Sequence, residues 1–122
     1  MDKSQSIDSF WSSFNIPAYD EYTTPDKASL PYLTYEMASD DFYGGNVALT
    51  GNLWYKGKSW KEISEKADEI ASYIGLGGVI VETDGGAIWI KKGTPFARRM
   101  EEPTNDNIRR IVLNIMVEFI TN

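Results

Sequence analysis

The residues that first suggest chemistry are five glycines within GLGGVIVETDGGAIWI, residues 75–90. Such a stretch is a candidate phosphate cradle, because free backbone amides at the start of a helix bind anionic oxygens. A phosphate loop, however, follows a strand and opens a helix. The first three glycines do the reverse: they follow a helical pattern and lead into the strand pattern 78–83. We therefore interpret them as a helix cap and a strand entry, followed by a hairpin turn at 84–86.

Two adjacent carboxylate pairs, Asp40-Asp41 and Glu101-Glu102, are the next candidates for acid–base or metal chemistry. Adjacent side chains on an extended chain point to opposite sides, so neither pair alone forms a metal claw or a catalytic dyad. The chain contains no histidine and no cysteine. This composition removes the commonest proton shuttle, the thiolate nucleophile and the usual zinc ligands. We therefore expect no catalytic residues, no metal and no cofactor.

Three basic pairs lie in the last third of the chain. They are Lys91-Lys92, Arg98-Arg99 and Arg109-Arg110. On neighbouring strands, one side chain of each pair should point to each face of the sheet. The simplest interpretation is cross-strand pairing with nearby acids on a solvated face. The functional alternatives are contact with the acidic front half of another copy, which we prefer, and weak contact with DNA phosphates.

The charge of the chain is unevenly distributed along its 122 residues. Residues 1–46 hold two lysines and eight acids, whereas residues 85–122 hold six basic residues and four acids. The overall net charge of −6 argues against nonspecific nucleic-acid binding. Copies that meet head to tail would bring the acidic and basic parts together. No secretory leader pattern or membrane-length apolar run is present, and we expect a protein made in the cytoplasm.

The apolar periodicity predicts an α+β domain with helices packed on a mainly antiparallel sheet of four to six strands. Ile7, Phe10, Trp11 and Phe14 indicate a short N-terminal helix, capped by Ser4 or Ser6. A longer central helix should begin with a capping box at Ser59 and Glu62 and end at Gly75. The expected strands are 31–38, 46–55, 78–83, 87–92, 97–102 and 108–121, and residues 15–31 form an irregular connector. The segment 108–121 also fits a helix, but its clean alternation favours a strand. We expect one domain over 1–122, with 1–5 and 120–122 as candidate disordered ends.

The order of these elements resembles that of tail terminator (tail-completion) proteins of long-tailed phages and prophages. The resemblance covers most of residues 5–120, and its most distinctive blocks are PYLTYE, NVALTGNLWY, SWKEISEKADEIASYI and WIKKGTPFARRMEE. It implies a small non-enzymatic subunit that forms a six-membered homo-oligomeric ring, stops polymerisation of the major tail tube protein and faces the head–tail connector. The implied location is the head-proximal end of the virion tail, after synthesis in the host cytoplasm. The alternatives are another head–tail joining or minor capsid protein and, more distantly, a small bacterial ligand-binding module.

Large aromatic rings are abundant for so small a chain, and burying all of them in one copy is difficult. Some should therefore lie in interfaces, where such rings are enriched. The interface candidates from the sequence are Trp54, Tyr55, Trp89, Phe96, Arg98, Arg99, Arg109 and Arg110. A loop formed by Asp40, Asp41, Phe42 and Tyr43 is expected to contact a neighbouring ring.

Overall fold

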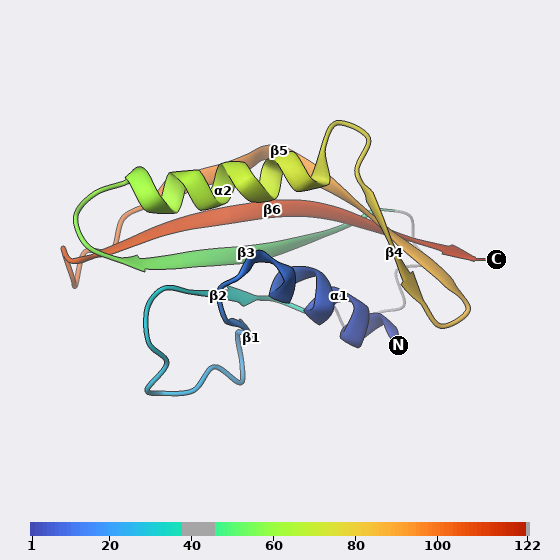
Figure 1. The fold of residues 1–122 in the computed structure, drawn as a ribbon, viewed down its shortest axis with the longest axis horizontal. Helices are drawn as coiled ribbons and strands as arrows, with labels where there is room; N and C mark the ends of the chain where they lie inside the picture. Colours follow the sequence, from blue (N-terminus) through green and yellow to red (C-terminus); the bar gives the residue numbers. More distant parts are fainter. Residues whose placement is uncertain (38–45, 122) are drawn as a thin grey trace.

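A six-stranded sheet forms the centre of the computed structural model, which describes residues 1–37 and 46–121 (Figure 1). The elements in chain order are α1 (Lys3–Trp11), a 3-10 turn (Ser12–Phe14), β1 (Ala18–Asp20), β2 (Tyr32–Tyr35), β3 (Val47–Lys56), α2 (Lys61–Ile74), β4 (Val79–Thr83), β5 (Gly86–Met100) and β6 (Ile108–Thr121). The strand order is β1-β2-β3-β6-β5-β4, and only the β1–β2 pair is parallel. The predicted α+β fold with a mainly antiparallel sheet is confirmed.

The strand β6 lies at the middle of the sheet, where it pairs with β3 on one side and β5 on the other. Its residues alternate between buried and half-buried from Arg110 to Glu118. A helix would not produce this two-residue period. The choice of a strand over a helix for 108–121 is therefore confirmed, and the alternation sorts β6 into one core face and one opposite face.

The strand β5 is longer than predicted. The sequence predicts separate strands at 87–92 and 97–102, but β5 includes the first segment and residues 97–100 of the second, and it ends at Met100. Its pairing with β6 shifts register between Lys92 and Ala97, around the cis Thr94–Pro95 bond. Proline removes one ladder donor, and a bulge absorbs the extra residues without ending the strand.

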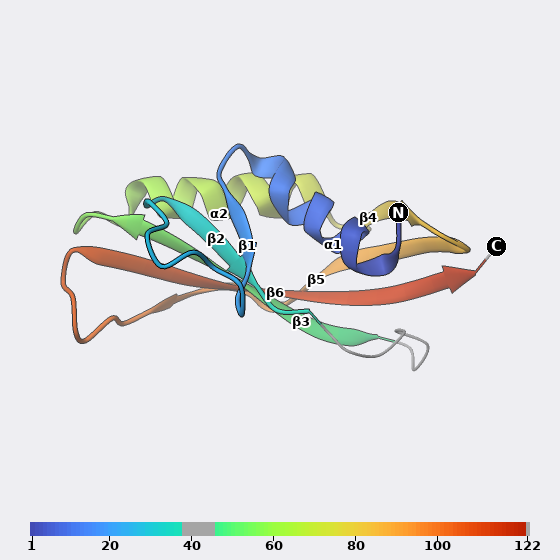
Figure 2. The same cartoon turned by 90° about the horizontal axis from the view of Figure 1, so that it is seen from below.

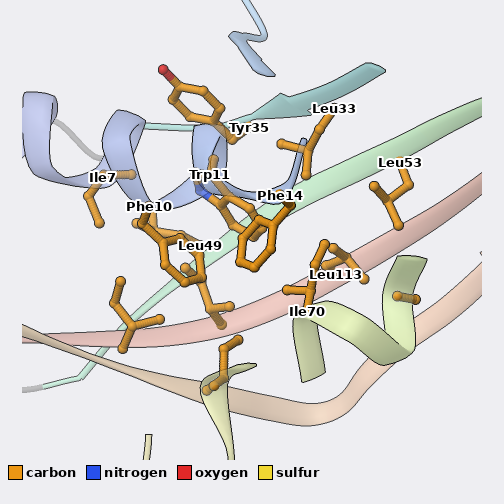
Figure 3. Packing of buried hydrophobic residues seen from close by; sticks show 14 of the residues in the cluster. Ile7, Phe10, Trp11, Phe14, Leu33, Tyr35, Leu49, Leu53, Ile70 and Leu113 are labelled. Carbon is orange, nitrogen blue, oxygen red and sulfur yellow. The ribbon is translucent and has the colours of Figure 1, made fainter. Parts of the chain in front are cut away.

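Both helices pack on the same face of the sheet, so the molecule has two layers (Figures 1 and 2). The predicted apolar stripes are buried except at Trp60, the expected first member of the second stripe, which is the half-buried N-cap residue of α2. The buried members are Ile7, Phe10, Trp11 and Phe14 from the first helical segment and Ile63, Ala67, Ile70 and Ile74 from α2. Figure 3 shows the rings of α1 packed over the strands. A Cβ on Gly51 of β3 would lie 2.9 Å from the Trp11 ring, so glycine is required for this close approach.

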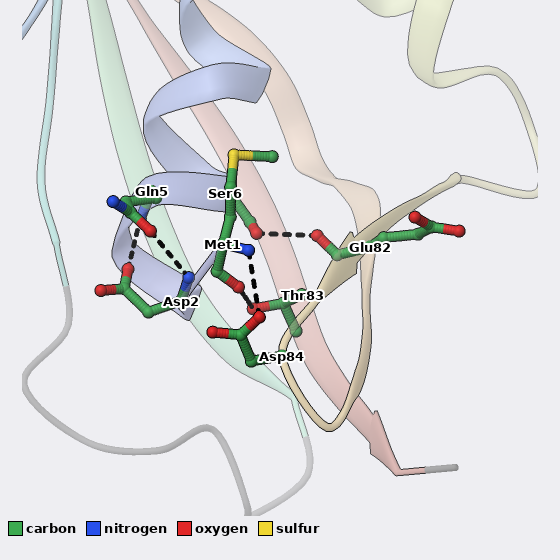
Figure 4. A network of polar contacts seen from close by, with 7 residues as sticks. All are labelled: Met1, Asp2, Gln5, Ser6, Glu82, Thr83 and Asp84. Atoms are coloured by element: carbon green, nitrogen blue, oxygen red, sulfur yellow. Dashed lines mark hydrogen bonds and ion pairs between the residues drawn. The ribbon is translucent and has the colours of Figure 1, made fainter.

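The caps of both helices differ from the sequence-based expectation. Asp2, rather than Ser4 or Ser6, caps α1, and it forms a reciprocal capping box with Gln5 (Figure 4). Ser6 instead donates its hydroxyl to the Glu82 carbonyl of β4 at 2.7 Å. The first helix therefore includes part of 1–5, the segment that we treated as a candidate disordered end.

At α2, the expected capping box between Ser59 and Glu62 does not form. The helix begins one residue later than a Ser59 cap would place it, and its N-cap residue is Trp60. The Ser59 hydroxyl still accepts a hydrogen bond from the Lys61 amide at 3.1 Å. One amide of the first turn is thus satisfied without the reciprocal partner that the motif requires.

The connector 15–31 contains a strand that the sequence analysis missed. Residues Ala18–Asp20 form β1, which pairs in parallel with Leu33–Tyr35 of β2. Three residues between prolines give no measurable period, so the alternation test has nothing to detect. This strand extends the sheet by one edge and fixes both ends of the following loop, 21–31.

Candidate assembly surfaces

The face of the sheet opposite the helices carries a line of aromatic rings. We call this face the open face, because neither helix lies over it (Figure 2). The ring centroids of Tyr19 and Tyr32 are 5.9 Å apart, and those of Tyr32 and Trp54 are 6.4 Å apart. The Arg110 guanidinium then lies 5.0 Å from the centre of the Trp54 ring. These four side chains, from β1, β2, β3 and β6, form the aromatic row.

Hydrogen bonds hold the aromatic row in place. The Trp54 indole N–H donates to the Thr34 hydroxyl at 3.0 Å. Arg110 donates from Nε to the Asn52 amide oxygen at 2.9 Å and forms an ion pair with Glu102 at 3.4 Å. Thr34 and Asn52 are buried beneath these larger groups even though they belong to the open face. Trp54 and Arg110 are therefore held in place, which lowers the entropy cost of binding a partner through them.

A second arginine–tryptophan cluster lies on the helix-covered face, at the end of the sheet where α2 begins. The guanidinium carbons of Arg99 and Arg109 are 4.8 and 5.3 Å from the centre of the Trp60 ring. Arg109 also donates to the backbone carbonyls of Lys58 and Asp106, each at 3.0 Å. Cation–π contacts of this kind contribute about 0.5–1 kcal/mol at exposed sites. Arg99 remains exposed on this cluster.

A hollow of about 550 Å³ lies at the other edge of the sheet, between the α2–β4 connection and the bulged part of β5. We call it the edge hollow. It is lined by Leu76, Gly77, Trp89, Lys91, Lys92, Gly93, Thr94, Pro95 and Phe96. The strand β4 pairs with β5 only as far as Ile90. The hollow therefore follows from the point at which β5 continues without β4 beside it.

At one end of the edge hollow, the side chains of Trp89 and Lys91 are held by several contacts. Trp89 donates its indole N–H to the Gly77 carbonyl at 2.8 Å. Lys91 lies 4.3 Å from the centre of the Trp89 ring, donates to Asn46 and pairs with Glu118 at 3.6 Å. These contacts hold the side chains of Trp89 and Lys91 in place. The charge of Lys91 is neutralised by Glu118.

Two tyrosines on the helix-covered side are perturbed by burial. Desolvation, followed by the hydrogen bond to Asp8 and the charges of Asp8 and Asp20, raises the pKa of Tyr35 well above its usual value. The Tyr35 hydroxyl donates to Asp8 at 2.5 Å. Desolvation, followed by the charges of Glu62 and Glu69, also raises the pKa of Tyr55. Both phenols therefore stay protonated across the physiological pH range.

The structure brings only some of the interface candidates together. Trp54 and Arg110 meet in the aromatic row, Arg99 and Arg109 meet on Trp60, and Trp89 and Phe96 line the edge hollow. Each of the arginine pairs is divided between the two faces, as the alternation predicted. Arg98 is exposed on β5, opposite Val112 of the open face.

Tyr55 does not belong to these surfaces. Its side chain is 8% exposed and belongs to the core, because it shares a face with Leu53 and Leu49 of β3. It has no free surface to offer to another copy. Asp40, Asp41, Phe42 and Tyr43, the proposed ring-contact loop, lie outside the described residues.

The sequence analysis missed three aromatic members of these surfaces: Tyr19, Tyr32 and Trp60. The alternation of 31–38 does place Tyr32 on the face opposite Leu33, and this signal was available. Tyr19 and Trp60 gave no such signal, because their contacts depend on strand order and on the exact start of α2.

Residues 1–37 and 46–121 contain neither a membrane-spanning helix nor a cluster of metal ligands. No helix in these ranges is long and apolar enough to cross a membrane. Within the same ranges, no three acidic residues gather closely enough to hold a metal ion.

The comparisons with known proteins inform the fold only. No family model matches the chain, and no curated sequence matches it either. Solved structures do match it. One aligns with a TM-score of 0.66 and 11% sequence identity, over 98% of this chain and 94% of the other. The name of that protein states no activity or partner. At this identity, the likeness shows a shared fold across nearly the whole length of both chains.

Proposed function

We propose that this protein is a tail terminator of a long-tailed phage or prophage. It acts without catalysis, as a homo-oligomeric ring that caps the tail tube and joins it to the head connector. The observation that carries the proposal is the aromatic row, a rigid surface on a sheet face that neither helix covers. Tryptophan, tyrosine and arginine side chains are the types that most often anchor protein–protein interfaces, and those of the aromatic row are half-buried.

The family resemblance supplies the identity of the partners, namely further copies of the chain, the major tail tube protein and the connector. The two-layer fold supports association, since a small subunit with one covered face and one exposed face covers the second face only by binding. In this proposal, DNA passes through the ring with at most nonspecific contacts. The protein then resides at the head-proximal end of the tail, after synthesis in the host cytoplasm.

The test is to polymerise the tube protein from the same genome with and without this protein and to measure tube lengths by electron microscopy. We expect shorter tubes of narrow length distribution, each with a ring at one end. Trp54→Ala should weaken capping, whereas Ser72→Ala, an exposed change on α2, should leave capping intact. Unchanged tubes without end rings would contradict the proposal. Rings that bind the connector and ignore the tube would favour another head–tail joining protein.

A further inference from the structure

The loop 21–31 between β1 and β2 contains an exposed tyrosine, Tyr22. Tyr22 is 86% exposed, although large aromatic side chains are usually at least half covered. Its backbone amide donates to the Asp20 carboxylate at 2.9 Å, and the Thr23 amide donates to the Asp20 carbonyl at 3.0 Å. The Thr24 hydroxyl reaches the same carbonyl at 3.1 Å. Asp20 thus holds the backbone of the turn that carries Tyr22, and the exposed ring projects from a fixed turn.

Two acidic residues are close to Tyr22 in the sequence. Glu21 directly precedes it, and Asp26 follows within the same loop. Both are exposed, and neither forms an ion pair with another of the described residues. With the exposed Lys27 directly after Asp26, the loop holds two acids and one lysine, and Glu21 is the acid next to Tyr22.

The edge hollow has the complementary chemistry. Leu76 is fully exposed on its rim, and the half-buried ring of Phe96 lines it. Lys92 is half-buried in the same lining and forms no ion pair with any described residue, in contrast to Lys91. The hollow therefore offers apolar contact for a ring and an unpaired cation for a carboxylate.

The loop and the hollow lie at opposite edges of one sheet. The loop extends from β1, the first strand in the spatial order, and the hollow lies at β4 and β5, the last two. In Figure 1, loop 21–31 lies at the lower side of the molecule and the α2–β4 connection at the upper side. A donor and an acceptor on opposite edges produce a head-to-tail contact, which closes into a ring if the rotation per subunit allows it.

We infer that Tyr22 of one copy inserts into the edge hollow of the next copy, with Glu21 of the first copy facing Lys92 of the second. This inference rests on the proposed function, since it names the contact from which the ring would be built. A second copy is the occupant that the charges favour. The loop belongs to the part of the chain with two lysines and eight acids, and the hollow to the part with six basic residues and four acids.

Cysteine cross-linking tests the contact directly, because the natural chain contains no cysteine. In the variant Tyr22→Cys/Leu76→Cys, both positions are exposed, so the fold should tolerate the changes. Under mild oxidation at ring-forming concentration, we expect a ladder of disulfide-linked oligomers on a denaturing gel. The matched control is Tyr22→Cys/Thr104→Cys, which places the second thiol on the exposed turn between β5 and β6 and should remain at the background level.

Charge exchange tests the direction of the contact. Glu21→Lys and Lys92→Glu each place like charges in every interface, and each variant alone should associate about tenfold more weakly. When the two variants are mixed, every interface of an alternating ring again pairs opposite charges. We expect the mixture to recover the wild-type oligomer in native mass spectrometry, as should the double variant Glu21→Lys/Lys92→Glu. A two-fold symmetric contact elsewhere on the surface would show no such recovery.

The outcomes separate this inference from the proposed function. Wild-type rings that cap tubes, together with absent cross-links and no recovery on mixing, would overturn the Tyr22 contact and leave the tail terminator proposal standing. A wild-type protein that stays monomeric and leaves tubes uncapped would overturn both. Circular dichroism of each variant establishes whether it is folded. If a cysteine variant is unfolded, the charge variants, which change only exposed or half-buried side chains, decide the outcome.

Discussion

Trp11 and Trp54 pack on opposite faces of β3, and their surroundings differ in the properties that determine the role of a large ring. Trp11 is fully buried between α1 and the sheet, and its indole nitrogen has no hydrogen-bond partner among the described residues. Trp54 is half-buried, its indole N–H is satisfied by Thr34, and a guanidinium lies over its ring. The covered face stabilises the fold by excluding water. The open face retains hydrogen-bonded, accessible rings, which is the arrangement that binding surfaces use.

The largest expected difference between the two faces is in the free energy of unfolding of the tryptophan variants. Trp11→Ala should lower it by about 3–5 kcal/mol, because the change removes a fully buried ring and leaves a cavity. Urea denaturation followed by far-ultraviolet circular dichroism measures the loss. Trp54→Ala serves as the matched variant on the other face. An equal loss for the two variants would abolish the distinction between a core face and an open face.

The contact between Trp11 and Gly51 provides a second test. Gly51→Ala should lower the free energy of unfolding by about 1–3 kcal/mol, because the new Cβ would overlap a ring that the core holds in place. Gly77→Ala is the control, since a Cβ there meets nothing within 4 Å. Combining Gly51→Ala with Trp11→Phe should cost less than the sum of the single changes. Strict additivity would show that the ring does not impose the glycine.

On the open face, Trp54→Ala should cost only about 1–2 kcal/mol of folding stability, through lost ring and cation contacts. Its larger effect should be on association, measured by sedimentation velocity across a concentration series. A double-mutant cycle with Arg110→Ala sharpens the result, because the two side chains are in contact. A variant with unchanged association would remove the aromatic row from the assembly surfaces.

The smallest expected effect concerns Tyr35. The raised pKa of Tyr35 means that the folded chain keeps the phenol proton after the unfolded chain has released it. The stabilisation is therefore complete below about pH 10 and is lost as the pH rises above that value. Tyr35→Phe should cost about 1 kcal/mol at neutral pH through the lost Asp8 hydrogen bond and should flatten the alkaline decline. Thermal melts between pH 8 and 11 measure both effects. An identical alkaline decline in the variant would contradict the assignment to Tyr35.

The elements that the sequence predicts well are those with a long, clean period. The stripe of α2 and the alternation of 108–121 both extend over more than ten residues, and both are buried as predicted. Short or interrupted elements fail for a physical reason. In β1, three residues carry no period, and in β5 a bulge around Pro95 looks like the end of a strand. The cap of α1 was missed because the actual cap, Asp2, lies outside the apolar stripe.

The assembly surfaces were only partly predictable. Residue type and alternation place Trp54 and Arg110 on one face, but they do not place the strands β3 and β6 side by side. The same alternation, applied to 46–55, puts Tyr55 on the face of Leu53, opposite Trp54, and hence in the core. The choice of Tyr55 as an interface candidate gave ring size more weight than strand position. The edge hollow could not be predicted, because it arises where β4 begins beside β5.

The parallel direction of β1 and β2 determines which mutations the connecting loop tolerates. Two parallel neighbours cannot be joined by a tight hairpin, so the chain must travel back the length of the strand outside the sheet. The eleven residues of loop 21–31 form this connection, and Tyr22 is one of them. Deletions in loop 21–31 would disrupt the pairing of β1 with β2, whereas insertions or substitutions in the loop would leave that pairing intact. Mutation can therefore replace Tyr22 by another side chain, while the parallel pairing of β1 and β2 continues to require a connecting loop outside the sheet.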